Sequence, residues 1–517
     1  MNIPNHLLIP FSAEKLINAQ VFWCAGDRQT LLSRYAYLIP DGETFNDLLL
    51  DSDSRKTFYA ERYGGTGTAL NGGGARVGLC DGYQVKGIGR TPVAGASAEQ
   101  WYSYGGLTLI DAIHETINYH VVNALLPHGA VEIAGIILTG NNSALAETDT
   151  PDDLSTRFGS GALLVRKNVV RPAHFLPSED YQPLTPLPYS ELSRVKSLVR
   201  AYCSQFPSQE ALIDWMSERV LRFAQQMTKA RVCRLYHGAP SSSNFSIDAA
   251  WLDLTNTSFC HSGRNDGFPY RWLDDIDIDS LTFTPWFYFM CKYSGLDLNT
   301  EAFSQYYRDA VAYYQPIYLL WVLGIDLEEW PDESIETLAR PLAADISELL
   351  YTPILSVETT HWDDQLASFI IALYTSPLHQ GHAILMELLT ALSLDPHTCL
   401  ITSLRRCLIT DVFDKKNVSA LFRNQDMALE CQQSYLQDYI ACTSWAFANS
   451  DIMLEHHGAV VRVNTTTHTY RLSTEQYCRT FHSLNTLLSG LEEPHPVPPF
   501  IRTYLKVFDR YLGCLPC

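Results

Sequence analysis

Two oxygen-bearing side chains near the middle of the chain have the types and spacing of a magnesium site. Asn244 lies in a serine-rich stretch at residues 237–246, and Asp253 follows it closely. Amide and carboxylate oxygens are hard ligands that suit Mg²⁺. The spacing is typical of a catalytic loop followed by a metal-binding aspartate, and it predicts that Asn244 and Asp253 bind Mg²⁺. The alternative is a serine-rich surface loop with an unrelated aspartate.

Three residues in the first quarter of the chain have side chains suited to phosphate chemistry. Lys86 ends a short β-prone run between glycines, and Arg76 follows a glycine run centred on Gly73, where the backbone could approach phosphate oxygens. Glu115 lies on a predicted helix and could orient the lysine. Phosphoryl and nucleotidyl transfer need cations on the phosphates and side chains that hold those cations. Taken singly, Lys86 and Glu115 also fit ordinary solvated surface residues.

The elements that would position these residues begin with a β-rich part. A strand is predicted at residues 84–86. The helix predicted at residues 107–126 has an apolar residue at every fourth position on one face. Residues 131–139 and 162–165 have the pattern of buried strands, and the polar residues 140–160 between them are predicted to be a long loop or insertion.

The second part of the chain is mostly helical. It follows a proline-rich linker at residues 183–189, and a loop-rich section at residues 236–269 interrupts it. We therefore predict the α+β class and a bilobal protein-kinase-like fold. A small β-rich N-lobe would carry one main helix, and a larger, mostly helical C-lobe would face it across a cleft. The predicted helices cover residues 190–233, 303–323, 334–351, 365–394 and 427–447.

The length of 517 residues allows two to four packed units. We expect residues 1–55 to be an N-terminal extension and residues 56–182 to be the kinase-like N-lobe. Residues 190–420 would be the helical C-lobe with the catalytic and metal loops. Residues 421–517 would be a C-terminal helical region that ends in a Cys-x-x-Cys tail.

Composition and charge exclude some classes of function. Hydrophobic residues make up 46% and charged residues 18% of the chain, which is typical of a globular protein. The formal net charge of −20 argues against a general nucleic-acid or anionic-membrane surface. The start of the chain lacks a secretory signal, and the apolar runs are too short to span a bilayer, so we expect a cytoplasmic location without membrane insertion.

The order of these motifs resembles that in the selenoprotein O family, whose members are protein adenylyltransferases with a kinase-like fold. The resemblance covers about the first half of the chain. It rests on Gly73-Gly74-Ala75-Arg76, Gln84-Val85-Lys86-Gly87-Ile88-Gly89-Arg90-Thr91-Pro92, Gly105-Gly106-Leu107 before His114-Glu115-Thr116, Val165-Arg166, Val170-Arg171-Pro172-Ala173-His174-Phe175, and residues 237–246 with Asp253.

The resemblance implies ATP and Mg²⁺ as cofactors and a role for each matching residue. Glu115 would pair with Lys86, while Asn244 and Asp253 would hold the metal. In this family ATP is bound flipped relative to ordinary kinases, so that AMP rather than phosphate is transferred. The nucleotide and its phosphates would be bound by Gly73, Arg76, Lys86, Gly105, Arg166 and Arg171.

Two positions depart from the family pattern. The glycine at Gly106 replaces an arginine, which removes one possible nucleotide contact. Ser243 stands where the family has an acid, the expected general base, and a serine hydroxyl cannot serve as that base near neutral pH. A carboxylate nucleophile is already ionised and needs no base. The site therefore favours a carboxylate substrate over a serine or tyrosine hydroxyl, or else Ser243 marks a lost activity.

Within this superfamily the chain is most similar to the siderophore-microcin maturation proteins of the MchC and MceJ type. The similarity lies in overall length and in Arg62-Tyr63-Gly64-Gly65-Thr66-Gly67. It implies a small acyltransferase-like protein subunit as partner, a microcin precursor peptide and a glucosylated enterobactin as substrates, and ATP-dependent activation of the peptide's C-terminal carboxylate for ester formation. The alternatives are adenylation of hydroxyl side chains and a catalytically inactive pseudokinase scaffold.

The chain ends in Cys514-Leu515-Pro516-Cys517. This ending resembles the redox-type cysteine pair of selenoprotein O chains, and the resemblance suggests Cys260 as a disulfide partner of Cys514 or Cys517. An incidental pair of cysteines in a frayed tail is the equal alternative. His261 could be a metal ligand, but a loop histidine that makes ordinary hydrogen bonds is the favoured interpretation.

Overall fold

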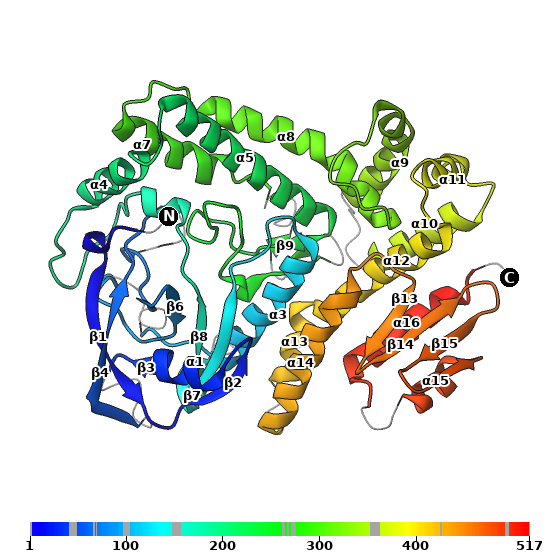
Figure 1. Cartoon of the computed structure of the whole chain (residues 1–517), viewed down its shortest axis with the longest axis horizontal. Coiled ribbons are helices and arrows are strands. Elements are labelled where there is room, and N and C mark those ends of the chain that lie inside the picture. The colour runs from blue at the N-terminus through cyan, green and yellow to red at the C-terminus, as the bar shows by residue number, and fades with distance from the viewer. Residues whose placement is uncertain are drawn as a thin grey trace.

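The structure is a computed structural model that describes residues 3–40, 49–65, 68, 70–96, 104–146, 157–260, 264–265, 268–269, 276–351, 362–423, 427–491 and 496–515. It is of the mixed α+β class, as predicted, with an antiparallel sheet in the N-terminal region and helices after it (Figure 1).

The N-terminal region forms one eight-stranded antiparallel sheet in the order β2-β7-β8-β6-β5-β4-β1-β3. Residues 1–55, expected to be an extension, instead supply β1, β2, β3 and half of β4 to this sheet. The charged run of β4 hides its strand character, although its backbone pairs with β1 over most of its length. The strands are β1 (Ile9–Leu16), β2 (Gln20–Cys24), β3 (Tyr37–Leu38), β4 (Leu50–Ala60), β5 (Val77–Cys80), β6 (Tyr83–Lys86), β7 (Ile133–Ala146) and β8 (Arg157–Lys167), with α1 (Arg28–Tyr35) between β2 and β3.

Strands β7 and β8 reach further than the sequence pattern predicted. Residues 140–146 and 157–160 were expected to be loop, yet they continue the hairpin. The sequence here has no clear period-two pattern, and the register shifts between Gly140 and Ala144. Residues 147–156 of the predicted loop lie outside the described residues.

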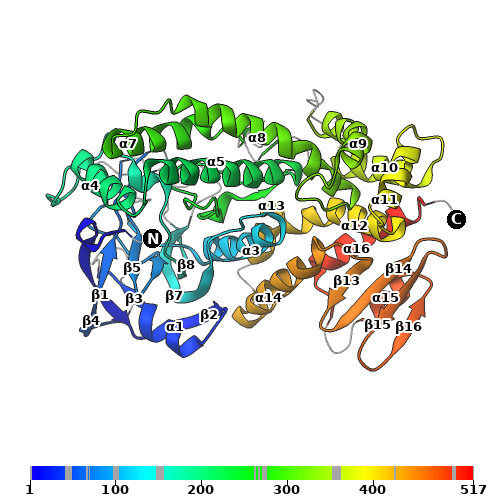
Figure 2. The ribbon, with the colours of Figure 1, turned by 45° about the horizontal axis from the view of Figure 1, so that its top comes forward.

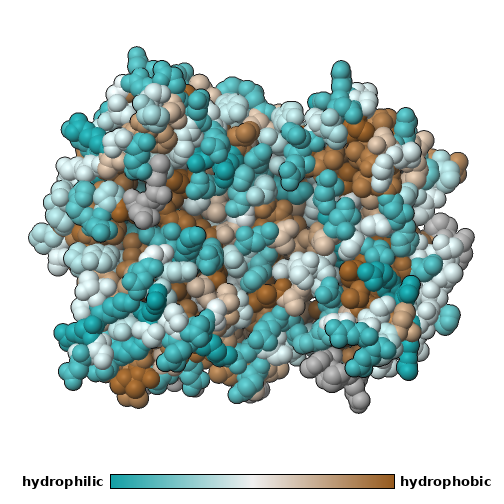
Figure 3. All heavy atoms as spheres, viewed as in Figure 1, coloured by the Kyte–Doolittle hydropathy of each residue, from teal (hydrophilic) through white to brown (hydrophobic). Residues whose placement is uncertain are grey.

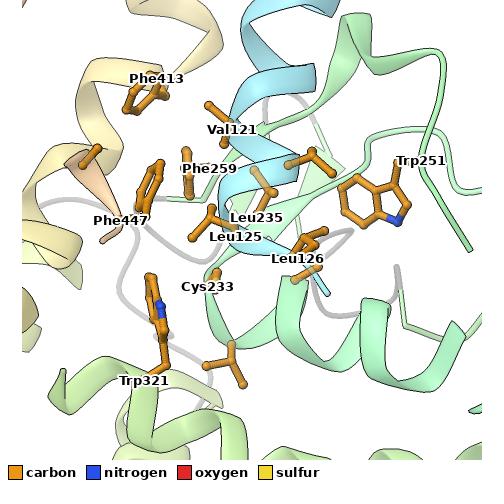
Figure 4. Packing of buried hydrophobic residues seen from close by; sticks show 14 of the residues in the cluster. Val121, Leu125, Leu126, Cys233, Leu235, Trp251, Phe259, Trp321, Phe413 and Phe447 are labelled. Atoms are coloured by element: carbon orange, nitrogen blue, oxygen red, sulfur yellow. The ribbon is translucent and has the colours of Figure 1, made fainter. Parts of the chain in front are cut away.

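The main helix of the N-terminal region is α3 (Leu109–Leu125), where a helix was predicted. Thr108 caps it by accepting a hydrogen bond from the Asp111 amide at 3.2 Å. Its apolar stripe, which includes Ile113, Ile117 and Val121, is buried. Figure 4 shows Val121 and Leu125 against Leu235, Phe259 and Phe447, so α3 joins the sheet to the helices that follow.

Helices dominate the middle of the chain, and two of the predicted ones are broken at prolines. The helix expected at residues 190–233 divides before Pro207, and the one expected at residues 365–394 divides at Pro377, because the residue before a proline is disfavoured in helical conformation. The helices are α4 (Glu191–Cys203), α5 (Gln209–Val232), α7 (Thr284–Ser294), α8 (Glu301–Leu319), α9 (Glu333–Tyr351), α10 (Trp362–Thr375), α11 (His382–Ala391), α12 (Pro396–Leu408), α13 (Lys415–Phe422) and α14 (Leu429–Ala446).

The C-terminal region is not purely helical, which corrects the prediction for residues 421–517. After α14 comes a four-stranded antiparallel meander of β13 (Ile452–His456), β14 (Ala459–Asn464), β15 (Thr469–Ser473) and β16 (Cys478–Phe481). The helices α15 (Leu484–Gly490) and α16 (Pro499–Leu512) complete it. Figures 1 and 2 both place this small sheet beyond α14, on the side away from the eight-stranded sheet.

One continuous apolar core runs from α3 through the helical region to α16. It includes Trp321 and Trp445, while Trp330 packs partly against it. On the face shown in Figure 3, hydrophobic residues lie in small groups separated by hydrophilic ones. Among the described residues no single helix is long and apolar enough to cross a membrane. One sharply bent pair, His382–Ala391 with Pro396–Phe413, meets the length and composition requirements together.

Candidate functional site

Lys86, Glu115 and Asp253 meet from three separate elements. Lys86 ends β6, Glu115 lies on α3, and Asp253 precedes the 3-10 helix η3 (Leu254–Asn256). Lys86 Nζ donates to Glu115 Oε1 and, at 2.7 Å, to Asp253 Oδ1. Lys86 and Glu115 are buried, so this lysine is not a solvated strand residue.

The pairing of β6 with β8 places a second cation beside the lysine. Gln84 lies directly opposite Arg166, and it shares a strand face with Lys86 because side chains alternate along a strand. Arg166 Nη1 donates to Asp253 Oδ1 at 3.0 Å and to Glu115 Oε2 at 3.4 Å. Arg166 Nε donates to Gln84 Oε1 at 3.0 Å. Arg166 thus connects both acids and is itself buried.

Arg171 adds a third cation and connects the serine-rich loop to this site. Its Nη1 donates to the Ser243 carbonyl at 2.7 Å and lies 3.6 Å from Asp253 Oδ2. Its Nη2 donates to Gln84 Oε1 at 3.0 Å, and its guanidinium lies over the Tyr63 ring at 4.9 Å. Lys86, Glu115, Arg166, Arg171 and Asp253 are called the Asp253 cluster below.

The cations of the cluster set the charge state of Asp253. Burial alone would raise the pKa of this carboxyl, but Arg166, Lys86 and Arg171 hold its pKa well below the usual range. Asp253 has the most accessible side chain of the cluster, with 22% of it exposed. It is therefore an ionised carboxylate within reach of a ligand.

The backbone at Asp253 is in an unusual conformation. Its φ of 59° and ψ of 55° lie in the left-handed region, which costs free energy for any residue with a side chain. Such residues occur preferentially where a site fixes the direction of a side chain. Here the conformation turns the carboxylate toward Lys86 and Arg166.

Asn244 lies beside the residue that precedes Asp253. Its carbonyl accepts the Leu252 amide at 3.1 Å, so the serine-rich loop folds back onto the segment that leads to Asp253. The Asn244 Nδ2 donates to the Ala239 carbonyl at 2.9 Å, which holds the amide plane. Oδ1 accepts from Ser243 Oγ at 3.4 Å, and its second lone pair can bind a metal. Asn244 and Asp253 together offer hard oxygens of the kind that Mg²⁺ takes, so the residues fit that ion.

The position expected for a general base is occupied by a hydroxyl. Ser243 is buried, and its Oγ lies 2.9 Å from Ser241 Oγ and 3.4 Å from Asn244 Oδ1. A hydroxyl in these hydrogen bonds stays protonated. The loop thus presents no carboxylate at residue 243.

Gly73 and Gly105, which are predicted to bind nucleotide, must also be glycines because of close backbone packing. A Cβ at Gly73 would lie 2.1 Å from the Glu61 carbonyl, and one at Gly105 would lie 2.1 Å from the Gly89 carbonyl carbon. Both glycines also have positive φ, of 144° and 90°. Arg76 donates to the Gly106 carbonyl at 3.3 Å. The nucleotide-binding roles of these three residues stay predictions.

Several residues at the site were not predicted. Gln84 is buried and bridges both arginines, and the period-two pattern with Lys86 could have identified it. Thr255 donates to Glu115 Oε1 at 3.0 Å. Glu61 accepts from Gln84 Nε2 at 3.0 Å. Burial opposes ionisation of Glu61, but His174, Arg171 and Arg166 lower its pKa, and no sequence signal marks this residue.

The predicted disulfide is not formed at Cys514. Cys260 is buried and Cys514 is exposed, and the two form no disulfide with each other. Cys517 and His261 lie outside the described residues.

No protein-family model matches the chain, and no curated protein is significantly similar to it.

Proposed function

We propose that the chain is an ATP- and Mg²⁺-dependent nucleotidyltransferase with a bilobal kinase-like fold. The observation that supports this most is the convergence of Lys86, Glu115 and Asp253 from a strand, a helix and a loop. The eight-stranded sheet with α3 would be the N-lobe, and the helices from α4 onward would form the C-lobe. The nucleotide phosphates would bind where these parts meet.

The contacts of Asp253 suggest how phosphate would bind. Its carboxylate accepts from Lys86 and Arg166 and lies near Arg171. Phosphate oxygens are acceptors of the same kind with higher charge, so they can take over these donors. Among the described residues, Arg166 Nη2 and Arg171 Nε are buried without an acceptor, and they are further donors for such a group. Asp253, released from its cations, would then turn to the metal with Asn244.

We propose that the group transferred is AMP and that the acceptor is the C-terminal carboxylate of a microcin precursor. The carboxylate oxygen forms a bond to the α-phosphorus, and the bond from that phosphorus to the β-bridging oxygen breaks. Pyrophosphate leaves with the electron pair. Mg²⁺ held by Asn244 and Asp253 would neutralise charge on the phosphates. The incoming carboxylate carries no proton to remove, which agrees with a hydroxyl at Ser243.

The second step would use the small acyltransferase-like subunit. A sugar hydroxyl of a glucosylated enterobactin attacks the acyl carbon, an ester forms, and AMP leaves. The hydroxyl proton passes to a base supplied by that partner. The need for ATP places this reaction in the cytoplasm.

A second candidate is a non-catalytic pseudokinase scaffold for the partner enzyme. It is favoured by the same contacts of Asp253, because this carboxylate is neutralised by cations of the protein itself. Adenylation of hydroxyl side chains is less well supported, since Ser243 cannot remove a proton.

The test uses ATP labelled in the α-phosphate or the γ-phosphate, the peptide and the partner. The proposal predicts release of pyrophosphate and label from the α-phosphate on the peptide carboxylate. ADP as product would indicate phosphorylation instead. The Asp253→Ala variant should lose conjugation, while Asp248→Asn, an exposed aspartate of the same region, should keep it.

Conjugation that survives Asp253→Ala would support the scaffold. Ser243→Asp separates the two acceptors. A gain of hydroxyl adenylation with loss of conjugation agrees with a carboxylate substrate, whereas improved conjugation contradicts it.

A further inference from the structure

A second group of metal-ligand side chains lies far along the chain from the Asp253 cluster. It consists of Asp438 on α14, His456 at the end of β13, and His457 in the turn that follows. The carboxylate oxygen and the imidazole nitrogens of these residues all lie within 4.8 Å of one another. Figures 1 and 2 both show α14 beside β13, so residues from two elements meet at this point.

The turn between β13 and β14 brings the two histidines together. His456 pairs with Ala459, which leaves His457 and Gly458 as a two-residue turn. Their φ angles of 46° and 78° are both left-handed, as in a type I′ hairpin, where Asn-Gly is the usual pair. Neighbouring side chains on a strand point to opposite faces, but this turn reverses the chain. The imidazole rings therefore lie 4.5 Å apart between centroids, at 86° to each other.

The cluster combines buried and accessible groups. His456 is buried, and the Asp438 side chain is only 11% exposed. The His457 side chain is 47% exposed, and its Nε2 lies 3.5 Å from Asp438 Oδ1. An ion could reach this position from solvent past His457 while two of its ligands are held by the surrounding protein.

We propose that Asp438, His456 and His457 bind a divalent transition-metal ion of the Zn²⁺ class. Imidazole nitrogen with one carboxylate suits zinc and its neighbours, whereas Mg²⁺ and Ca²⁺ prefer oxygen ligands alone. In a tetrahedral zinc site with metal–ligand bonds of about 2.1 Å the ligand atoms lie about 3.4 Å apart, so side-chain rotations have to bring these atoms closer by at most about 1.4 Å to close the site. Three protein ligands leave a position for water or an external ligand.

A simple contact between His457 and Asp438 is the plainer interpretation. It involves one histidine and gives His456 no part. The metal site uses both imidazoles and gives a reason for a histidine in a turn position that asparagine fills at lower cost. A bound ion would also fasten the β13–β14 hairpin to α14, and so the small sheet to the helical core.

The experiment uses the full-length protein, stripped of metal with a chelator and then titrated with Zn²⁺. Bound zinc is counted by mass spectrometry after desalting, and Co²⁺ serves as an optical probe of the same site. The variants His457→Asn and Asp438→Asn each remove a ligand, and asparagine keeps the turn at residue 457. His468→Asn is the matched control, because His468 also lies at a left-handed turn position, with φ of 48°, at the other end of β14.

The wild type and His468→Asn should bind one Zn²⁺ per chain more than the two ligand variants. The affinity of that site should fall at least about tenfold in the variants, since even changes behind metal ligands cost this much. Zn²⁺ should raise the melting temperature of the wild type and of the control more than that of His457→Asn. Equal zinc content in His457→Asn and the wild type, or no zinc in the wild type, would overturn the proposal.

Discussion

Two pairs of buried arginines in this protein are held in different ways. Arg405 on α12 donates to main-chain carbonyls at the end of α14 and the start of β13, those of Ala446, Ala448, Ser450 and Ile452. Arg166 and Arg171 donate mainly to side chains of the Asp253 cluster and to Gln84. The first arrangement completes the hydrogen bonds of a helix end, whereas the second collects charge around one accessible carboxylate.

Arg406, the residue after Arg405, is also fully supplied with acceptors, unlike Arg166 and Arg171. Arg406 makes a bidentate pair with Asp326, at 3.1 and 2.7 Å, and also donates to the Phe447 and Trp321 carbonyls. Among the described residues, Arg405 and Arg406 keep no buried donor without an acceptor, while Arg166 Nη2 and Arg171 Nε do. Arginines that only support the fold are thus expected to matter for stability, and those of the Asp253 cluster for ligand binding.

The largest effect is expected for Arg405→Met. This change removes the donor from the carbonyl of the buried Ala446 and from three carbonyls of less buried residues, and it should lower the free energy of unfolding by about 3–5 kcal/mol. Urea denaturation followed by circular dichroism measures the loss. A loss below about 1 kcal/mol would show that the carbonyls find other donors and that Arg405 has no structural role.

A pH-dependent effect is expected at His237, which begins the serine-rich loop. Burial lowers the pKa of His237 to about 4 from its ordinary 6.5. Above pH 6.5 the histidine is neutral in both states, and its contribution to stability is complete. As the pH falls from 6.5 toward 4, the unfolded chain binds a proton that the folded chain does not, so stability decreases, by about 3 kcal/mol at most.

The measurement is the free energy of unfolding at several pH values between 7.5 and about 4.5. Other buried histidines contribute to the same slope, so the wild type is compared with His237→Asn. The difference between the two should shrink as the pH falls. A difference that stays constant would mean that the pKa of His237 is the same in the folded and the unfolded chain, which contradicts the prediction.

A smaller effect, on activity, is expected for Arg166→Lys. Lysine keeps the charge but cannot donate to Asp253, Glu115 and Gln84 at once. The proposed nucleotidyl transfer should fall by about 10- to 100-fold, while the loss of stability stays well below that of Arg405→Met. A rate close to that of the wild type would show that Arg166 does not take part in the reaction. A variant that does not fold would show that Arg166, like Arg405, is needed for stability.

Part of the site could be predicted because its residues lie in motifs whose order along the chain resembles that of a known family. The predicted pairing of Lys86 with Glu115 is present, and Asp253 joins it. Glu61 could not be predicted, because its partners become neighbours only when β4 enters the sheet. The roles of Gly73 and Gly105 stay predictions, since close backbone packing already requires glycine there.

The fold was predictable where apolar residues recur with a clear period. The stripe of α3 gave its bounds to within two residues at each end. The meander of β13 to β16 was missed because its strands are short and half polar, as in Cys478–Phe481. The broken helices at Pro207 and Pro377 show the opposite error, in which an apolar pattern continued past a residue that ends a helix.

The central claim is that the Asp253 cluster binds ATP together with Mg²⁺. Isothermal titration of ATP into the purified chain, with and without Mg²⁺, tests it for the wild type, Asp253→Asn and the control Asp248→Asn. The account predicts one ATP per chain for the wild type and the control, with affinity that depends on Mg²⁺, and loss of this dependence in Asp253→Asn. No binding of ATP by the wild type, or the same Mg²⁺ dependence in Asp253→Asn, would contradict it.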